Sequence, residues 1–495
     1  MDYRLKAICD LSVPSARERA GRHEYDGTPQ DLSPSGVRAG LAALGGPGYP
    51  DRHDEALALA AEHTLRVSFG ELELHRSNPL WHIANLELTC YDREYAAEAA
   101  RAEARRAHLA AWPDAVDAAV TALDRVPAPV ATAALPAARG LATGVQDPAA
   151  LGALDRLVAH LEHAAEHGEP AAALGASALT ALLSATEALD VNLADLVTQA
   201  ELERKRLRQL LDESCRRIDP EAPSERTVRA LLADRPTPDQ VLGEAAALVA
   251  EVIAWTAEQG LVPYDDGECV VEPTPPSQPW QVAAMVPAAP GEPDAPSRFY
   301  VTPPGPDWPE RDREQWLSLY ARSFLPVIAV HEVAPGHFSH GRALRRVASP
   351  VRRTWLSDAF TEGWAHYTEE LALEQGFRSA DPGFPVAVAR DGLLRITRLI
   401  CLIGLHSGDL SVADATRRFT EDAFLEGRTA TRAVHRLLLD PLCGGYAWGK
   451  LAIRDLRDQA RERWGAAFSL RRFHTALFDL GAPPLGLLDT ALERG

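Results

Sequence analysis

Apolar residues recur at helical spacing through most of this 495-residue chain. Residues 115–124 and 149–164 each carry one apolar stripe, at intervals of three and four residues, which is typical of an amphipathic helix. Residues 194–218 repeat the pattern, with Asn192 placed to cap the helix. Residues 93–108 are rich in Ala, Glu and Arg, which favour helix. The pattern predicts a mainly α-helical protein whose helices each bury one face.

The helical pattern breaks between residues 262 and 310, where Pro and Gly are dense. Three short runs there have strand character, at residues 269–271, 281–286 and 298–302. We predict a small sheet or a pair of edge strands, since proline is tolerated at sheet edges. A helix is expected to start near Arg311 and to run into the region of residue 331. The chain thus has an N-terminal helical region, 1–260, and a second region, 261–495, which we treat as one continuous unit.

Composition and charge exclude several classes of function. The formal net charge is −19, whereas proteins that bind nucleic acid or anionic membranes need a basic surface. The six cysteines are widely separated and form no C-x-x-C pair, so neither a zinc ribbon nor a dithiol site is expected. The first residues form no apolar signal segment, and no apolar run reaches the length of a membrane span. We expect a soluble cytoplasmic protein with no nucleic-acid or membrane partner.

The most distinctive motif is a histidine pair. HEVAPGHFSH, residues 331–340, nearly spells H-E-x-x-H, in which two histidines one helical turn apart reach one zinc ion. Here His331 and His337 are six residues apart, and an unbroken helix would turn them about 240° from each other. Pro335 and Gly336 lie between them, and these residue types break helices and permit unusual backbone conformations. We therefore predict a local break after which the helix resumes in phase.

A third metal ligand follows in the predicted helix 360–376. Glu362 lies 25 residues after His337, a spacing that lets a second helix return antiparallel and supply a carboxylate. A catalytic zinc takes three protein ligands and keeps one position open. His331, His337 and Glu362 therefore predict a site for one Zn²⁺ per chain, with Glu332 beside it as general base. This glutamate would take a proton from water and pass it to a leaving amine.

Three neighbouring side chains are candidates for the surroundings of the metal. His340 shares a helix face with His337 and is a ligand, a partner of a ligand, or an ordinary helix residue. His366 follows Glu362 by four residues, which favours a supporting or substrate contact over ligation. Asp358 precedes Glu362 by four residues and can orient a ligand, although an ordinary helix acid fits equally well.

Several other characteristic stretches of the sequence accompany this motif. Downstream of HEVAPGH, residues 360–367 spell the pattern F-x-E-G-W-A-x-Y. Other characteristic stretches are residues 77–95, 270–280, 398–411 and 468–488. Together they resemble the bacterial family catalogued as domain of unknown function 885. The resemblance implies a zinc metallopeptidase-like protein with an HExxPGH motif, a helical bundle enclosing a cleft, a small β element, and short peptides or peptide-like small molecules as substrates.

The same resemblance and the analogy with helical zinc peptidases add three candidate residues. His406 and Tyr446 would bind the oxyanion or a substrate terminus, and Arg398 would pair with a substrate carboxylate. For these three, the alternative is that they close buried hydrogen-bond networks. An edge strand near residues 298–302, which contains Tyr300, is expected to bind an extended peptide by strand addition.

The chain departs from the pattern of that family at four positions. Phe338, His340, His366 and Leu402 stand where the family has His, Gln, Leu and Asp. Because the ligand set is kept while its surroundings differ, we expect an altered substrate, such as an amide in a biosynthetic pathway. Two other classes stay open: a metal enzyme of another reaction, such as one that uses non-haem iron, and a non-catalytic helical binding protein. Glu332 distinguishes them, because only a hydrolase needs a base beside the metal.

Overall fold

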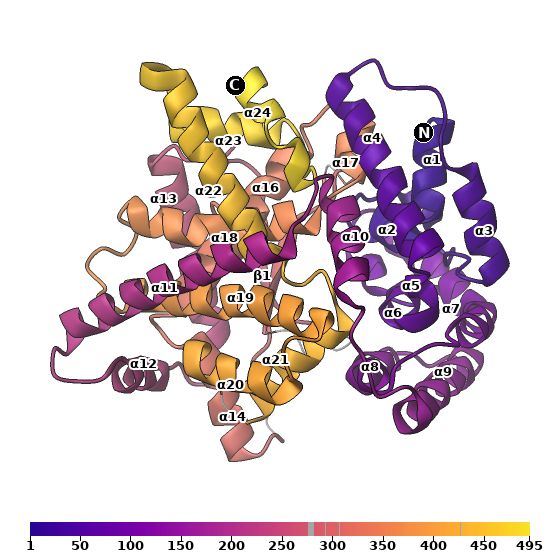
Figure 1. Ribbon diagram of the computed structural model, residues 1–495, viewed down its shortest axis with the longest axis horizontal. Coiled ribbons are helices and arrows are strands. Elements are labelled where there is room, and N and C mark those ends of the chain that lie inside the picture. Colours follow the sequence, from indigo (N-terminus) through magenta and orange to yellow (C-terminus); the bar gives the residue numbers. More distant parts are fainter. Residues whose placement is uncertain (276–281, 293, 306, 426) are drawn as a thin grey trace.

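The computed structural model describes residues 1–275, 282–292, 294–305, 307–425 and 427–495. It is a helical bundle with one small sheet, as the sequence predicted. In Figure 1 the first nine helices lie on one side of the molecule and most of the later helices on the other. These nine helices are α1 Tyr3–Asp10, α2 Val13–Glu18, α3 Pro34–Ala43, α4 Arg52–Leu65, α5 Leu74–Ser77, α6 Leu80–Asn85, α7 Glu98–Ala122, α8 Ala128–Gly140 and α9 Pro148–His167.

Helices α7, α8 and α9 form a three-helix unit with an aliphatic core. The helices predicted at 93–108 and 115–124 are one continuous helix, α7, because Pro113 is accommodated within it. Helix α9 matches its predicted stripe, with Leu154, Leu157 and Leu161 buried. The sequence therefore located α9 and most of α7, whereas α8 and the joining of the two pieces of α7 were not predicted.

Helices before and after residue 260 share one core. Four long helices follow the three-helix unit: α10 Ala176–Glu187, α11 Leu193–Ile218, α12 Ser224–Ala233 and α13 Val241–Glu258. Asn192 caps α11 as predicted, since its side chain accepts from the amides of Ala194 and Asp195. Helix α11 packs along α19, Gly383–Ser407, and the largest apolar cluster extends across both regions of the chain. The two predicted regions are thus parts of one packed body.

The sheet has three strands in the order β1-β3-β2. They are β1 Cys269–Pro273, β2 Ala283–Val286 and β3 Ser297–Val301; of the run predicted at 281–286, Gln281 lies outside the described residues. β3 pairs in parallel with β1 and antiparallel with β2. The prediction of an edge strand at 298–302 is therefore wrong, because β3 is central and Tyr300 is only 6% exposed. β2 provides an edge instead.

The chain then returns to helix, in shorter pieces than the sequence predicted. The helix expected from Arg311 ends at Leu317, and a new one begins only at Leu325. The remaining helices are α14 Glu310–Leu317, α15 Leu325–Glu332, α16 His337–Leu344, α17 Pro350–Thr354, α18 Asp358–Glu374, α20 Val412–Ala423, α21 Arg428–Leu439, α22 Gly445–Trp464, α23 Leu470–Phe478 and α24 Thr490–Arg494. Within the described residues, none of the helices combines the length and the apolarity that a membrane span requires.

Helices α18 and α22 approach each other through small residues, and this contact positions the candidate site. A methyl group at Gly449 would lie 1.8 Å from the carbonyl oxygen of Ala359, and one at Gly363 would lie 2.4 Å from the Cα of Gly449. Only glycine permits this approach of two backbones. As a result, Glu362 on α18 and Tyr446 on α22 are held on neighbouring helices.

Candidate metal centre

The predicted break between His331 and His337 is present. Helix α15 ends at Glu332 and α16 begins at His337, with the Gly336 amide donating to the Val330 carbonyl at 3.1 Å. A side chain at Gly336 would lie 1.8 Å from the His331 carbonyl oxygen, so the turn requires glycine. The two imidazole rings consequently face the same space, with centroids 4.9 Å apart and planes at 89°.

Glu362 completes a set of three donors. Its Oε2 lies 3.6 Å from Nε2 of His331 and 3.4 Å from Nε2 of His337. One ligand atom of each residue lies within 4.8 Å of the others. Two imidazoles and one carboxylate are a donor set of catalytic zinc sites, and the fourth position is left to water or substrate. The residues therefore fit a single zinc ion.

The charges around these three side chains favour the binding of a cation between them. Burial by itself would raise the pKa of Glu362, but His337 and His331 outweigh it and hold that pKa well below its usual range. Burial and Arg395 lower the pKa of His331, yet Glu362 and Glu369 outweigh them and raise it to about 9. A cation among these side chains receives the same stabilisation that a proton does.

Glu369 is a functional candidate that the sequence analysis missed. Its Oε1 accepts from Nδ1 of His331 at 2.7 Å, and its Oε2 accepts from Nδ1 of His366 at 2.9 Å. The side chain is fully buried, and an ion pair to Arg395 at 3.0 Å holds it ionised. This contact presents Nε2 of His331 to the metal position. The available signal was spacing, since Glu369 follows Glu362 by seven residues, two helical turns on one face.

Glu332 directly follows His331 in the chain, and its side chain lies against the sheet. Its Oε2 accepts from the amide of Met285 at 2.8 Å, which fixes the carboxylate against β2. The side chain is partly accessible to solvent, as a proton-transfer group must be. Since β2 pairs with β3 on its other side, the outer edge of β2 faces Glu332.

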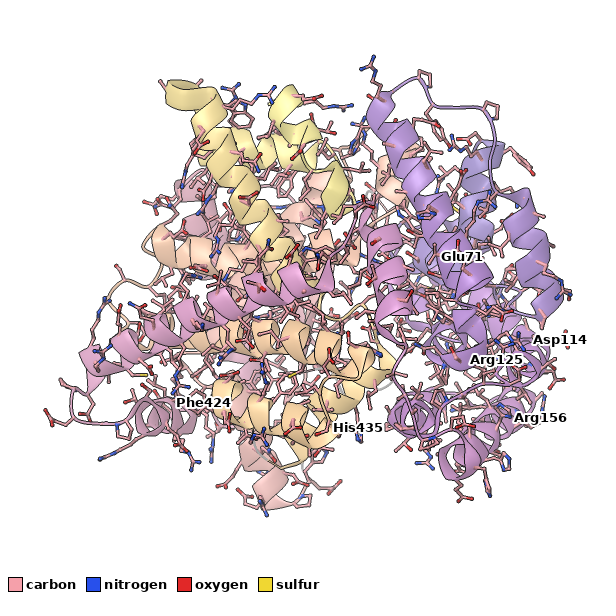
Figure 2. The ribbon with its side chains drawn as sticks, viewed as in Figure 1. Glu71, Asp114, Arg125, Arg156, Phe424 and His435 are labelled. Carbon is pink, nitrogen blue, oxygen red and sulfur yellow. The ribbon has the colours of Figure 1, made fainter. Side chains whose placement is uncertain are left out.

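Tyr446 and several arginines border the site. The Tyr446 ring lies nearly parallel to that of His331, with centroids 6.3 Å apart. The guanidinium groups of Arg398, Arg395 and Arg436 lie 5.1, 5.8 and 5.9 Å from the centre of the Tyr446 ring. Arg395 is paired with Glu369 and Asp391, whereas neither Arg398 nor Arg436 forms an ion pair with a carboxylate among the described residues. Arg436 follows His435, whose place on α21 Figure 2 marks.

The other predicted residues lie in different settings. His406 has both ring nitrogens bonded to the backbone, Nε2 to the Leu437 carbonyl at 2.9 Å and Nδ1 to the Leu174 amide at 3.3 Å. This bonding corrects the expected oxyanion role, because neither nitrogen is free to act. Asp358 points to Arg19 at 2.5 Å and is 62% exposed, so it orients no metal ligand.

Of the two remaining histidines, only His366 is linked to the centre, and that link is indirect. His340 bonds to the Gly481 carbonyl at 3.1 Å and packs between Phe360 and Phe478. His366 reaches His331 only through Glu369, where it occupies the second carboxylate oxygen. Tyr300, the predicted peptide contact, is buried in the central strand. The structure thus brings together His331, His337 and Glu362, with Tyr446 and Arg398 beside them, and Glu332 directly follows His331 in the chain.

Comparison with known proteins gives a family and a fold. The family model described as "Bacterial protein of unknown function (DUF885)" matches residues 50–492. A putative lipoprotein of unknown function from Shewanella oneidensis has a similar structure, with 19% identity, a TM-score of 0.77, and 99% of this chain and 98% of that chain covered. A putative lipoprotein from Colwellia psychrerythraea has 15% identity and a TM-score of 0.77, with coverages of 99% and 96%. At such identities the likeness extends to the fold alone. No curated protein shows significant sequence similarity to the chain.

Proposed function

The chain belongs to the DUF885 family, and we propose that this member is a zinc-dependent hydrolase of peptide or amide bonds in short peptides or peptide-like small molecules. The observation that carries the proposal is the convergence of His331, His337 and Glu362 within 4.8 Å, with Glu332 directly following His331 in the chain. If Glu362 only formed a structural ion pair with a histidine, neither the second histidine nor the adjacent Glu332 would be needed.

The residues divide the work of hydrolysis. His331, His337 and Glu362 would hold the zinc ion, which would supply the Lewis-acid chemistry that activates water and a carbonyl group. Glu332 has one oxygen bound to the Met285 amide, which leaves the other to accept a proton and later to return it to the leaving amine. Glu369 keeps His331 in the tautomer that directs Nε2 towards Glu362.

Substrate binding follows from the edge of β2 and from the arginines. An extended substrate paired with the outer edge of β2 passes next to Glu332, because the Met285 amide already contacts that carboxylate. Arg398 and Arg436 offer guanidinium groups to a substrate carboxylate. The cytoplasmic location expected from the sequence stays a proposal that cell fractionation tests.

Metal content is the first test. We expect about one zinc per chain in the purified protein and its loss in His337→Ala and Glu362→Ala. Glu374→Gln, on the same helix as Glu362 but paired with Arg457, is the matched control and should retain the metal. Iron in place of zinc would favour the oxygenase class. A protein without metal, even after zinc is added, would contradict the proposal and favour a binding protein.

Glu332→Gln tests the chemistry separately from metal binding. The variant should keep its zinc and lose about 10²- to 10⁴-fold in turnover on a panel of short peptides and amides, because glutamine cannot accept the proton. Unchanged turnover in this variant would remove Glu332 as the base. Efficient cleavage of a broad range of ordinary oligopeptides would contradict the narrower expectation of an altered substrate.

A further inference from the structure

A large cavity in the molecule is not lined by the proposed metal ligands. A cavity of about 530 Å³ separates α2, α4 and α6 from α18, α19 and α22, so its walls come from both sides of the molecule in Figure 1. His331, His337 and Glu362 are not among its lining residues. The volume falls in the range of small-molecule sites, about 300–1,000 Å³. This space is large enough for a ligand of its own.

Most of the wall is apolar and aromatic. Trp81 on α6, Trp355 after α17 and Trp448 on α22 line it, together with Leu399 and Leu402 on α19. Leu402 is one of the positions where this chain departs from the expected pattern of its family. An aspartate at this position would add a charge to the wall of the cavity, whereas leucine keeps the wall apolar. The wall therefore suits an apolar body, and indole faces also attract cations.

The acids in the wall differ in whether they have partners. Glu187 accepts from the Ser357 hydroxyl and the Leu485 amide, and Asp358 pairs with Arg19. Glu18 lies 3.5 Å from Arg17 and 3.6 Å from Arg93.

Glu87 differs from them. It is partly accessible and has no side-chain hydrogen bond or ion pair within the described part of the chain. Burial raises its pKa to about 7, and nearby Glu18 adds to the rise while Arg17 opposes it. A carboxyl group in an apolar wall without a partner is costly, and a cationic or hydrogen-bond-donating ligand relieves that cost.

We propose that this cavity binds an apolar primary amine, with its ammonium group on Glu87 and its apolar body against Trp81, Trp355 and Trp448. The site is independent of the proposed hydrolase function, since none of the metal ligands lines it. It nevertheless shares helices with the centre, because Gly445 and Leu399 in the wall adjoin Tyr446 and Arg398 in the chain.

Three probes of similar shape and different charge test the proposal: phenethylamine, 2-phenylethanol and 3-phenylpropionate. Each is titrated into the full chain by calorimetry, with tryptophan fluorescence as a second readout. We expect the amine to bind about ten- to a hundredfold more tightly than the alcohol, and the carboxylate to bind most weakly. Glu87→Gln should remove the preference of amine over alcohol while leaving the alcohol affinity unchanged.

Three further variants make the result specific. Glu71→Gln, at the exposed position marked in Figure 2, is the matched control and should bind all probes as the wild type does. Leu402→Trp fills the cavity and should weaken the amine and the alcohol alike. His337→Ala should leave amine binding intact, which separates this site from the metal centre.

Several outcomes would overturn the proposal. These are no saturable binding of the amine at millimolar concentration, equal affinity for amine and alcohol, or amine affinity that Leu402→Trp leaves unchanged. If Glu87→Gln fails to fold, the ranking of the three probes on the wild type and on Leu402→Trp still decides the matter. Loss of amine binding in His337→Ala would place the ligand at the metal centre instead.

Discussion

The three-helix unit α7–α9 and the helices around the candidate metal centre are both well packed, but their cores differ in polarity. The core of α7–α9 is a cluster of Ala, Leu, Val, Ile and Trp side chains, and its charged residues, among them Asp114, Arg125 and Arg156, lie outside (Figure 2). The core around the centre also buries His331, His366 and Glu369. An apolar core requires only that its side chains fill the available volume. A polar core also requires a hydrogen-bond or ion-pair partner for every buried polar group.

Two buried glutamates show this difference between partnered and unpartnered charge. Glu369 is surrounded by Arg395, His366 and His331, which outweigh its burial and hold its pKa below the usual value. Glu187 is also fully buried but has only neutral donors, and burial raises its pKa to about 7. The same side chain is therefore an anion in one environment and a proton acceptor near neutrality in the other.

Gly449→Ala should have the largest effect, because the new methyl group would lie 1.8 Å from a backbone oxygen of α18. The helices must separate, and we expect a loss of more than about 4 kcal/mol or no soluble protein. Gly152→Ala on α9 is the matched control, since nothing lies within 4 Å of its new methyl group. That variant should gain roughly 0.5–1 kcal/mol from helix propensity. Urea unfolding measures both, and an equal effect at the two glycines would refute the comparison.

Leu157→Ala tests the apolar core of α9. The residue is fully buried, so its truncation should cost about 2–5 kcal/mol in the free energy of unfolding. Metal content and affinity should stay at the wild-type value, because no side chain of the centre comes from α9. A change in metal affinity in this variant would mean that the two regions are coupled.

In contrast to Leu157→Ala, Glu369→Gln should lower the affinity for the metal. The substitution keeps volume and removes the carboxylate that accepts from His331, so zinc affinity should fall about 10- to 100-fold. Competition with a chelator of known affinity measures the change, and Glu374→Gln on the same helix serves as control. Unchanged affinity would show that Glu369 supports packing and not the metal.

Glu187→Gln gives the smallest effect and depends on pH. Because the pKa of Glu187 is about 7 in the folded state and ordinarily 4.5, the folded state binds the proton more tightly. The wild type therefore loses stability as the pH rises from 4.5 to 7, by up to about 3 kcal/mol at roughly 1.4 kcal/mol per pKa unit. Glutamine removes this slope, so the variant should gain about 1–2 kcal/mol over the wild type between pH 5 and pH 6.5. Urea unfolding measures the free energy of unfolding of both proteins at the two pH values. If the difference between the proteins is the same at both, the raised pKa of Glu187 is contradicted.

The sequence by itself determined the local features of the protein. Amphipathic stripes located α9 and α11, and Asn192 marked the start of α11, because helix periodicity and capping involve only neighbouring residues. The motif also predicted the break between His331 and His337, since Pro335 and Gly336 are the residue types that such a break requires.

Tertiary structure decided what depends on distant partners. β3 is central because β1 and β2 flank it, which no pattern within residues 297–301 reveals. His406 is occupied by backbone groups of Leu437 and Leu174, and Asp358 by Arg19, a residue 339 positions away. Glu369 became the support of His331 only when α15 and α18 packed together. Burial and long-range pairing fix the role of a polar side chain, and neither is written in its immediate sequence.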